Sequence, residues 1–281
     1  MTAMTLPRIA LPRIPLLDRL AIPAAALFLL IALVGPWLAP HDPYQVDLSQ
    51  ALQAPGPGHW LGTDAAGRDI LSRLLAGART TVLSSIVVVV FAAVVGIVVA
   101  ALAAIGGRWA DEILMRVCDI FLSIPGMILA LGIAAALGPS LRSTIIALVV
   151  ALWPPFARLV RAVLRETMAS TYVESARVMG VPARRLMARH VLPNSLDSLY
   201  VQAALDVSGV IVLMSGLSFL GVGAQPPSAD WGAMVADGRE FVTTAWWVAT
   251  VPGIAITLTA VVFGLFGDAL RSKLDPTLGD A

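Results

Sequence analysis

Six apolar segments dominate this sequence, and each is about as long as a helix that crosses a lipid bilayer. Such a helix needs about 20 predominantly apolar residues. Only 13% of the 281 residues are charged, against about 25% in a typical soluble domain. The sequence therefore predicts an all-α polytopic membrane protein with six transmembrane helices. The predicted spans are residues 20–38, 82–105, 113–137, 143–163, 196–220 and 246–270.

Lysine and arginine fall unevenly on the two sides of these spans. With the N-terminus inside, 14 of the 19 basic residues lie on the cytoplasmic side and five lie outside. Cytoplasmic loops of membrane proteins carry an excess of Lys and Arg. We therefore expect both termini in the cytoplasm. This topology alone accounts for Arg158, Arg161 and Arg165.

The predicted spans divide the chain into three parts. Residues 1–39 comprise a cytoplasmic N-terminus and the first transmembrane helix, and residues 40–81 form an extracytoplasmic segment. Residues 82–281 form a transmembrane core, with a cytoplasmic loop over 166–194.

The extracytoplasmic segment contains one helical pattern. Four apolar residues in the stretch 69–77 share one face of a helix, which predicts a short amphipathic helix lying on the membrane surface. Asp64 is the expected cap at its start. The four residues are Ile70, Leu71, Leu74 and Leu75.

The cytoplasmic loop has local signals for two short helices. Ser170 or Thr171 can cap the first helix, and Glu174 lies in its first turn, where the helix dipole favours an acid. Gly180 can take the left-handed conformation that ends a helix. A loop resting on lipid headgroups would explain the arginines here, but not a compact helix–glycine–helix unit. The pattern therefore favours a docking site for a cytoplasmic partner.

A spaced motif lies within the same loop. Glu174-Ser-Ala176 is followed by Gly180 and then, after nine intervening residues, by His190-Val-Leu-Pro193. This spacing resembles the EAA loop of bacterial ABC importer permeases, which reads E-A-A, then G, then I-x-L-P. Ser175 stands in place of the second-position alanine, and His190 stands in place of the isoleucine.

Further motifs resemble the C-type (DppC/OppC-like) permeases of the dipeptide, oligopeptide and nickel branch, from about residue 37 to the end. They are 61–64, 67–69, 72–73, 77–79, Asp119, 123–125, 217–221, 225–227, 231–234, 267–268 and 274–276.

This resemblance implies a type I ABC importer permease fold in the bacterial cytoplasmic membrane, with the loop acting as a coupling helix. It implies two partner ATPase subunits or domains that bind ATP and Mg²⁺, a second, DppB/OppB-like permease in a heterodimer, and an extracytoplasmic solute-binding protein. The expected substrates are dipeptides, oligopeptides or nickel chelates. The expected ATPase-docking residues are Tyr172, Glu174, Ser175, Ala176 and Gly180.

Enzymatic activity in this chain is not expected. A P-loop needs a glycine-rich loop followed by lysine, and the only lysine, Lys273, follows no such loop. An intramembrane metalloprotease needs His-Glu-x-x-His, whereas His41, His59 and His190 each lie in a loop. We therefore predict no catalytic residues, no metal site and no cofactor in the chain itself.

An ion-coupled secondary transporter is the alternative function. Ionisable groups within spans are costly and often functional, and Asp206 lies ten residues into the fifth predicted span. A single acid at this depth is weak support for an ion relay. In an importer, the candidates for the translocation path are Asp206, Ser208, Met214 and Ser215. Helix packing or hydrogen bonding between subunits is at least as good an explanation of these residues.

The long outer loop between the fifth and sixth spans offers a candidate contact for the binding protein. Its candidate residues are Gln225, Pro226 and Trp231. For Trp231 we favour anchoring at the membrane interface, where tryptophan is enriched.

Overall fold

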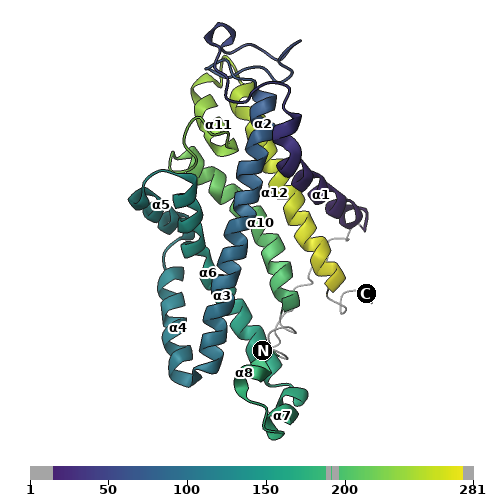
Figure 1. Ribbon diagram of the computed structural model, residues 1–281, viewed down its shortest axis with the longest axis vertical. Coiled ribbons are helices and arrows are strands. Elements are labelled where there is room, and N and C mark those ends of the chain that lie inside the picture. The colour runs from purple at the N-terminus through teal and green to yellow at the C-terminus, as the bar shows by residue number, and fades with distance from the viewer. Residues whose placement is uncertain (1–14, 188–190, 192–195, 275–281) are drawn as a thin grey trace, which may run out of the picture.

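The computed structural model describes residues 15–187, 191 and 196–274, and these residues form an elongated helical bundle (Figure 1). No β-strand occurs in the described ranges, which contain two isolated bridges only. The first helices are α1 (Pro15–Leu38), η1 (Leu48–Gln50), α2 (Ile70–Ala78), η2 (Arg79–Leu83), α3 (Ser84–Ile105), α4 (Gly107–Leu122) and α5 (Gly126–Leu137). The later ones are α6 (Leu141–Met168), α7 (Thr171–Val178), α8 (Ala183–Leu186), α10 (Leu196–Phe219), α11 (Trp231–Gly238), η4 (Arg239–Phe241) and α12 (Trp247–Leu274).

Five continuous helical stretches are long and apolar enough to cross a membrane, and a bent pair of helices supplies the sixth span. The six-span fold is therefore confirmed. The third predicted span, 113–137, is broken within its length, where α4 and α5 meet at 86°. The break falls at Pro125, whose backbone is extended. Proline lacks the N–H group that would continue the helix.

The predicted separate surface helix is also wrong. α2 continues through the π-helical turn η2 into α3, giving one helical stretch of 36 residues that is about 54 Å long. Its cap is Asp69 rather than Asp64, because the Asp69 carboxylate accepts a hydrogen bond from Ser72 N at 2.8 Å. The boundary that we placed after residue 81 falls inside this stretch.

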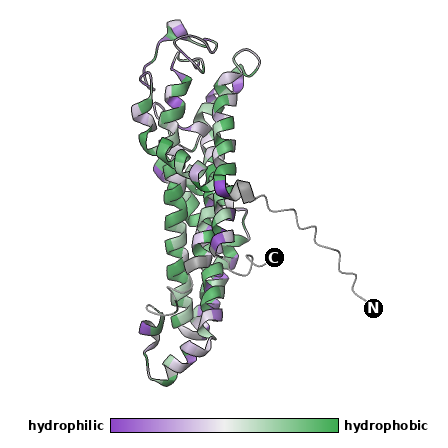
Figure 2. Ribbon diagram, turned by 90° about the vertical axis from the view of Figure 1, so that its right-hand side faces the viewer, coloured by the Kyte–Doolittle hydropathy of each residue, from purple (hydrophilic) through white to green (hydrophobic). Residues whose placement is uncertain are grey.

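Close approach of backbones holds the long helices together. A Cβ added to Gly96 of α3 would lie 2.5 Å from Phe156 Cβ and 2.8 Å from Ala157 N of α6. Small residues at such contacts let membrane helices pack tightly. Hydrophobic residues cover most of the length of the bundle, and hydrophilic ones gather toward its two ends (Figure 2).

The two ends of the bundle differ in structure. α7 and α8 project beyond the long helices at one end, which we call the loop end (Figure 1). Residues 39–69 and α11 lie at the opposite end, which we call the cap end. The joined α2–α3 stretch runs from the cap end toward the loop end, whereas α4 returns beside the lower part of α3 and α5 lies across the side of the bundle (Figure 1).

Candidate functional site

The loop end carries the helix–glycine–helix unit that the sequence predicts. The carbonyl of Ser170 accepts hydrogen bonds from Val173 N and Glu174 N, both at 3.1 Å, at the start of α7. Gly180 has a φ of 81°, in the left-handed region. Val181 N then donates back to Ala176 O at 3.2 Å. This backward bond after a left-handed glycine is a Schellman cap, so the predicted left-handed conformation of Gly180 at the end of the helix is confirmed.

α7 has one buried and one exposed face. Val173 is fully buried and belongs to the same apolar cluster as Leu186. On the exposed side, Val178 and Met179 are 84% and 76% exposed and Tyr172 is 47% exposed. Exposed apolar residues that gather at one place mark interaction surfaces. α7 therefore presents an apolar surface at a polar end of the molecule.

All five residues predicted to dock the ATPase lie on α7 or at its end. Ala176 is half-buried, and the other four are exposed. The exposed ones are Tyr172, Glu174, Ser175 and Gly180. His190 and residues 192–193 of the motif lie outside the described residues.

Ion pairs between α4 and α6 support the base of this loop. The Asp111 carboxylate accepts hydrogen bonds from both Arg161 and Arg165, including Arg161 Nη2 at 2.6 Å. Arg158 pairs with Asp119, about one turn from Arg161 along α6 and about two turns from Asp111 along α4. Topology alone is therefore an incomplete explanation of these arginines. We call this set the α4–α6 ion pairs; they hold the last turns of α6, which lead directly into α7.

Asp206, one of the predicted path residues, lines a cavity in the bundle. This cavity has a volume of about 110 Å³ and lies between α3, α6 and α10. Gln202 Nε2 donates a hydrogen bond to the Asp206 carboxylate at 2.9 Å. The acid that the sequence predicts within a membrane span therefore lies beside a cavity in the structure.

The other three candidates fill helix contacts within this chain. Ser208 donates a hydrogen bond to Ala260 O of α12 at 2.7 Å. Met214 is fully buried, and its Sδ atom accepts a hydrogen bond from Ser85 Oγ at 3.7 Å. Ser215 is buried under α11, where a Cβ on Gly232 would lie 2.2 Å from Ser215 O. Their surroundings favour the packing explanation.

Trp231 is a buried anchor of the cap end, and its prediction as a surface or interfacial residue is wrong. Its side chain is 2% exposed, and its Nε1 donates to Leu74 O at 2.9 Å. Gly77 makes room for the indole, since a Cβ there would lie 2.8 Å from Trp231 Cδ1. Asp230 caps α11 by accepting from Ala233 N at 3.1 Å, and its burial raises the pKa of this carboxyl.

Gln225 and Pro226 are exposed at the cap end, as a binding-protein contact requires. Pro226 borders an open hollow of about 760 Å³ between the 39–69 segment, the end of α10 and α11. Charged side chains line the hollow. Asp237 pairs there with Arg68 at 3.7 Å; burial raises the pKa of the Asp237 carboxyl, and the nearby Arg68 opposes that rise.

Comparison with known proteins decides the family. Residues 92–280 match the family described as binding-protein-dependent transport system inner membrane component. The chain belongs to this permease family. Residues 24–55 of the permease also match the N-terminal transmembrane domain of oligopeptide transport permease C.

Two curated relatives align with the permease over nearly its whole length. The dipeptide transport system permease protein DppC of Escherichia coli (strain K12) is 42% identical over 257 residues, covering 89% of this chain and 85% of the relative. The di/tripeptide transport system permease protein DppC of Pseudomonas aeruginosa (strain UCBPP-PA14) is 40% identical over 261 residues, covering 91% and 86%.

A solved structure shares the fold. A chain of the MetNI methionine ABC transporter in inward-facing conformations superimposes with a TM-score of 0.58 at 20% identity, covering 72% of this chain and 96% of that chain. The permease is thus a multi-pass inner membrane subunit of an ABC importer, with the type I fold. ATP hydrolysis in this family resides in partner subunits, and the match favours the importer over the secondary transporter.

Proposed function

We propose that this permease moves dipeptides and oligopeptides across the cytoplasmic membrane by alternating access, driven by ATP hydrolysis in two partner subunits. The exposed apolar surface of α7, held on a Schellman-capped helix, is the observation that carries this proposal. The peptide class is supported by the named activities of two relatives at 40–42% identity. The loop end and both termini then lie in the cytoplasm.

α7 is the element that docks an ATPase subunit. Val178, Met179 and Tyr172 form its apolar contact, while Glu174 supplies a charge beside them. Ser175 and Ala176 are small and let the partner approach closely. When ATP draws two ATPase subunits together, each carries one α7 with it, and the α4–α6 ion pairs transmit the movement into the bundle.

Asp206 contributes the polar part of the path on this subunit. Its cavity is small, about 110 Å³, so one chain does not enclose a route wide enough for a peptide. A second permease of DppB/OppB type completes the path as a heterodimer.

The cap end receives the solute-binding protein. Gln225 and Pro226 stand at the edge of the hollow that Arg68, Arg239 and Glu240 line. Its charged lining and its volume suit contact with a polar protein surface. Trp231 supports this surface indirectly, because its hydrogen bond to Leu74 O holds α11 against α2.

Uptake of labelled dipeptide into proteoliposomes tests this function. We expect uptake by the assembled transporter to require ATP and the binding protein, and to persist when an ionophore collapses the ion gradients. We expect Asp206→Asn to reduce the rate by less than tenfold, because its carboxylate lines the path without relaying a proton. Uptake that follows an ion gradient in the absence of ATP would contradict the proposal and favour the secondary transporter.

A further inference from the structure

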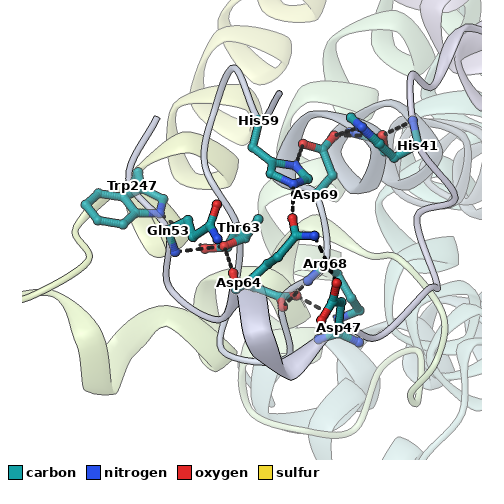
Figure 3. Close-up of polar contacts among 11 residues, drawn as sticks. His41, Asp47, Gln53, His59, Thr63, Asp64, Arg68, Asp69 and Trp247 are labelled. Atoms are coloured by element: carbon teal, nitrogen blue, oxygen red, sulfur yellow. Dashed lines mark hydrogen bonds and ion pairs between the residues drawn. The ribbon is translucent and has the colours of Figure 1, made fainter. Parts of the chain in front are cut away.

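Two histidines and one aspartate from separate segments meet beside the start of α2 (Figure 3). His41 follows α1, His59 lies between η1 and α2, and Asp69 caps α2. One nitrogen or oxygen atom of each lies within 4.8 Å of those of the other two. Imidazole and carboxylate groups together suit divalent transition metals.

The separations of these atoms fit the dimensions of a zinc site. His59 Nδ1 lies 2.9 Å from Asp69 Oδ1, and His41 Nδ1 lies 3.7 Å from Asp69 Oδ2. Zinc bonds of about 2.0–2.2 Å in a tetrahedron place neighbouring ligand atoms about 3.3 Å apart. The two distances run to different oxygens of Asp69 and lie on either side of that value, and the three ligand atoms lie within 4.8 Å of one another. Side-chain rotations are therefore needed to bring all three atoms onto one ion. An adjoining cavity of about 140 Å³, lined by His41, His59 and Asp69 among others, has room for an ion and a water.

A chain of hydrogen bonds orients His59 with its Nδ1 toward the site. Gln50 Nε2 donates to the Asp47 carboxylate at 2.9 Å, which directs Gln50 Oε1 toward His59 Nε2 at 2.5 Å. An amide oxygen only accepts, so His59 Nε2 carries a hydrogen. Metal-binding histidines usually donate their second ring N–H to an oxygen in this way.

This orientation creates a need for positive charge beside Asp69. In a neutral His59 ring protonated at Nε2, the Nδ1 lone pair faces Asp69 Oδ1 at 2.9 Å, and two such electron pairs repel each other. A cation between them turns the repulsion into two bonds. A divalent ion bound to both His59 Nδ1 and Asp69 Oδ1 would therefore remove this repulsion.

Hydrogen bonds to Ser72 hold the Asp69 carboxylate and the backbone of His41 in place before any ion binds. Asp69 Oδ2 accepts hydrogen bonds from Ser72 N at 2.8 Å and Ser72 Oγ at 2.7 Å, and this side chain is 1% exposed. The backbone N of His41 donates to the same Ser72 Oγ at 3.0 Å. The His41 side chain remains 45% exposed, which leaves an entry for the ion from solvent.

We propose that His41, His59 and Asp69 bind one divalent transition-metal ion, and that a water completes the coordination. Zinc is the ion with which we test this site. Mg²⁺ and Ca²⁺ bind poorly here because they prefer sites built from oxygen ligands. The ion ties the segment after α1 to the start of α2 and so stabilises the cap end. This site stands independently of the transport proposal.

Zinc titration of the purified, chelator-treated full-length chain in detergent tests the site. We expect calorimetry to show one zinc ion per chain, and the melting temperature to rise with zinc concentration but not with magnesium. We expect His41→Ala to weaken zinc binding at least tenfold. Because His41 is partly exposed, this variant should melt at the same temperature as the original chain when no metal is present.

Two further variants keep the test decisive. Asp69→Asn preserves the cap of α2, since asparagine is also a good N-cap, but should lose zinc affinity. His190→Ala removes the third histidine of the chain and should bind zinc like the original. The proposal is overturned if the original chain binds no zinc at a 1:1 ratio, or if His41→Ala binds it unchanged. Stabilisation that depends only on pH would likewise overturn it and place a proton between His59 and Asp69.

Discussion

Replacing Gly180 with valine is expected to reduce ATP-driven uptake at least tenfold while the subunit still inserts into the membrane. Gly180 has a φ of 81°, a conformation that costs a residue with a side chain about 1–2 kcal/mol and costs a β-branched residue more. Each 1.4 kcal/mol corresponds to about a factor of ten. The strain opens the cap of α7 and turns its apolar surface away from the partner. Uptake and ATP hydrolysis by the reconstituted transporter measure the loss.

Two matched variants separate backbone strain from added bulk. No atom lies within 4 Å of a Cβ built on Gly180, so a clash is not the cause. Asparagine tolerates the left-handed region better than valine, and Gly180→Asn should retain most of the uptake. Gly132→Val adds the same bulk at an open position on α5 and should have little effect. Equal losses in Gly180→Val and Gly180→Asn would rule out the conformational explanation.

Replacing Asp111 with leucine is the second change for which we expect a large effect. The Asp111 carboxylate is 15% exposed and holds Arg161, which is 24% exposed, together with Arg165. Its removal leaves two guanidinium groups facing each other without their shared anion. The cost falls between about 0.5 kcal/mol for an exposed pair and about 3–5 kcal/mol for a buried one. We expect the melting temperature to fall by about 5 °C and uptake to fall with it.

A neighbouring pair supplies the control for Asp111. Asp119 and Arg158 are 43% and 51% exposed, so Asp119→Leu should change the melting temperature by about 1 °C or less. A double variant, Asp111→Leu with Arg161→Leu, should be less damaging than the sum of its single changes, because the two residues interact. Additive effects, or an Asp119 variant as unstable as the Asp111 variant, would contradict the role given to these ion pairs.

Features encoded by local sequence were predictable. Continuous apolar length identified every membrane segment, because the lipid core sets the length of a spanning helix. The α7 unit was predictable because capping residues and Gly180 act over a few positions, and Gly180 has the expected left-handed backbone. Asp206 was found as a lone acid within an apolar span.

Features that depend on distant residues were not predictable. Asp111 and Arg161 are 50 positions apart, and Trp231 reaches Leu74 across 157 positions. Tryptophan is a residue type that is common at membrane interfaces. Trp231 is buried instead because Gly77, which lacks a side chain, leaves space for its indole ring. His41 and His59 have no metal-binding spacing along the chain, since the folded loop before Asp69 brings them together. Pro125 marks the break between α4 and α5 in the sequence, but the angle of 86° between the two helices could not be predicted from it.

Site-directed cross-linking from α7 tests the docking claim most directly. The single native cysteine, Cys118, is buried, so a cysteine placed at Val178, which is 84% exposed, is the main reactive thiol. A cysteine at Leu48, 73% exposed at the cap end, is the matched control. With a short bifunctional reagent, we expect Val178→Cys to cross-link to a copurified ATPase subunit and Leu48→Cys not to do so. Failure of the Val178 variant to cross-link within an intact, ATP-hydrolysing complex would contradict the account.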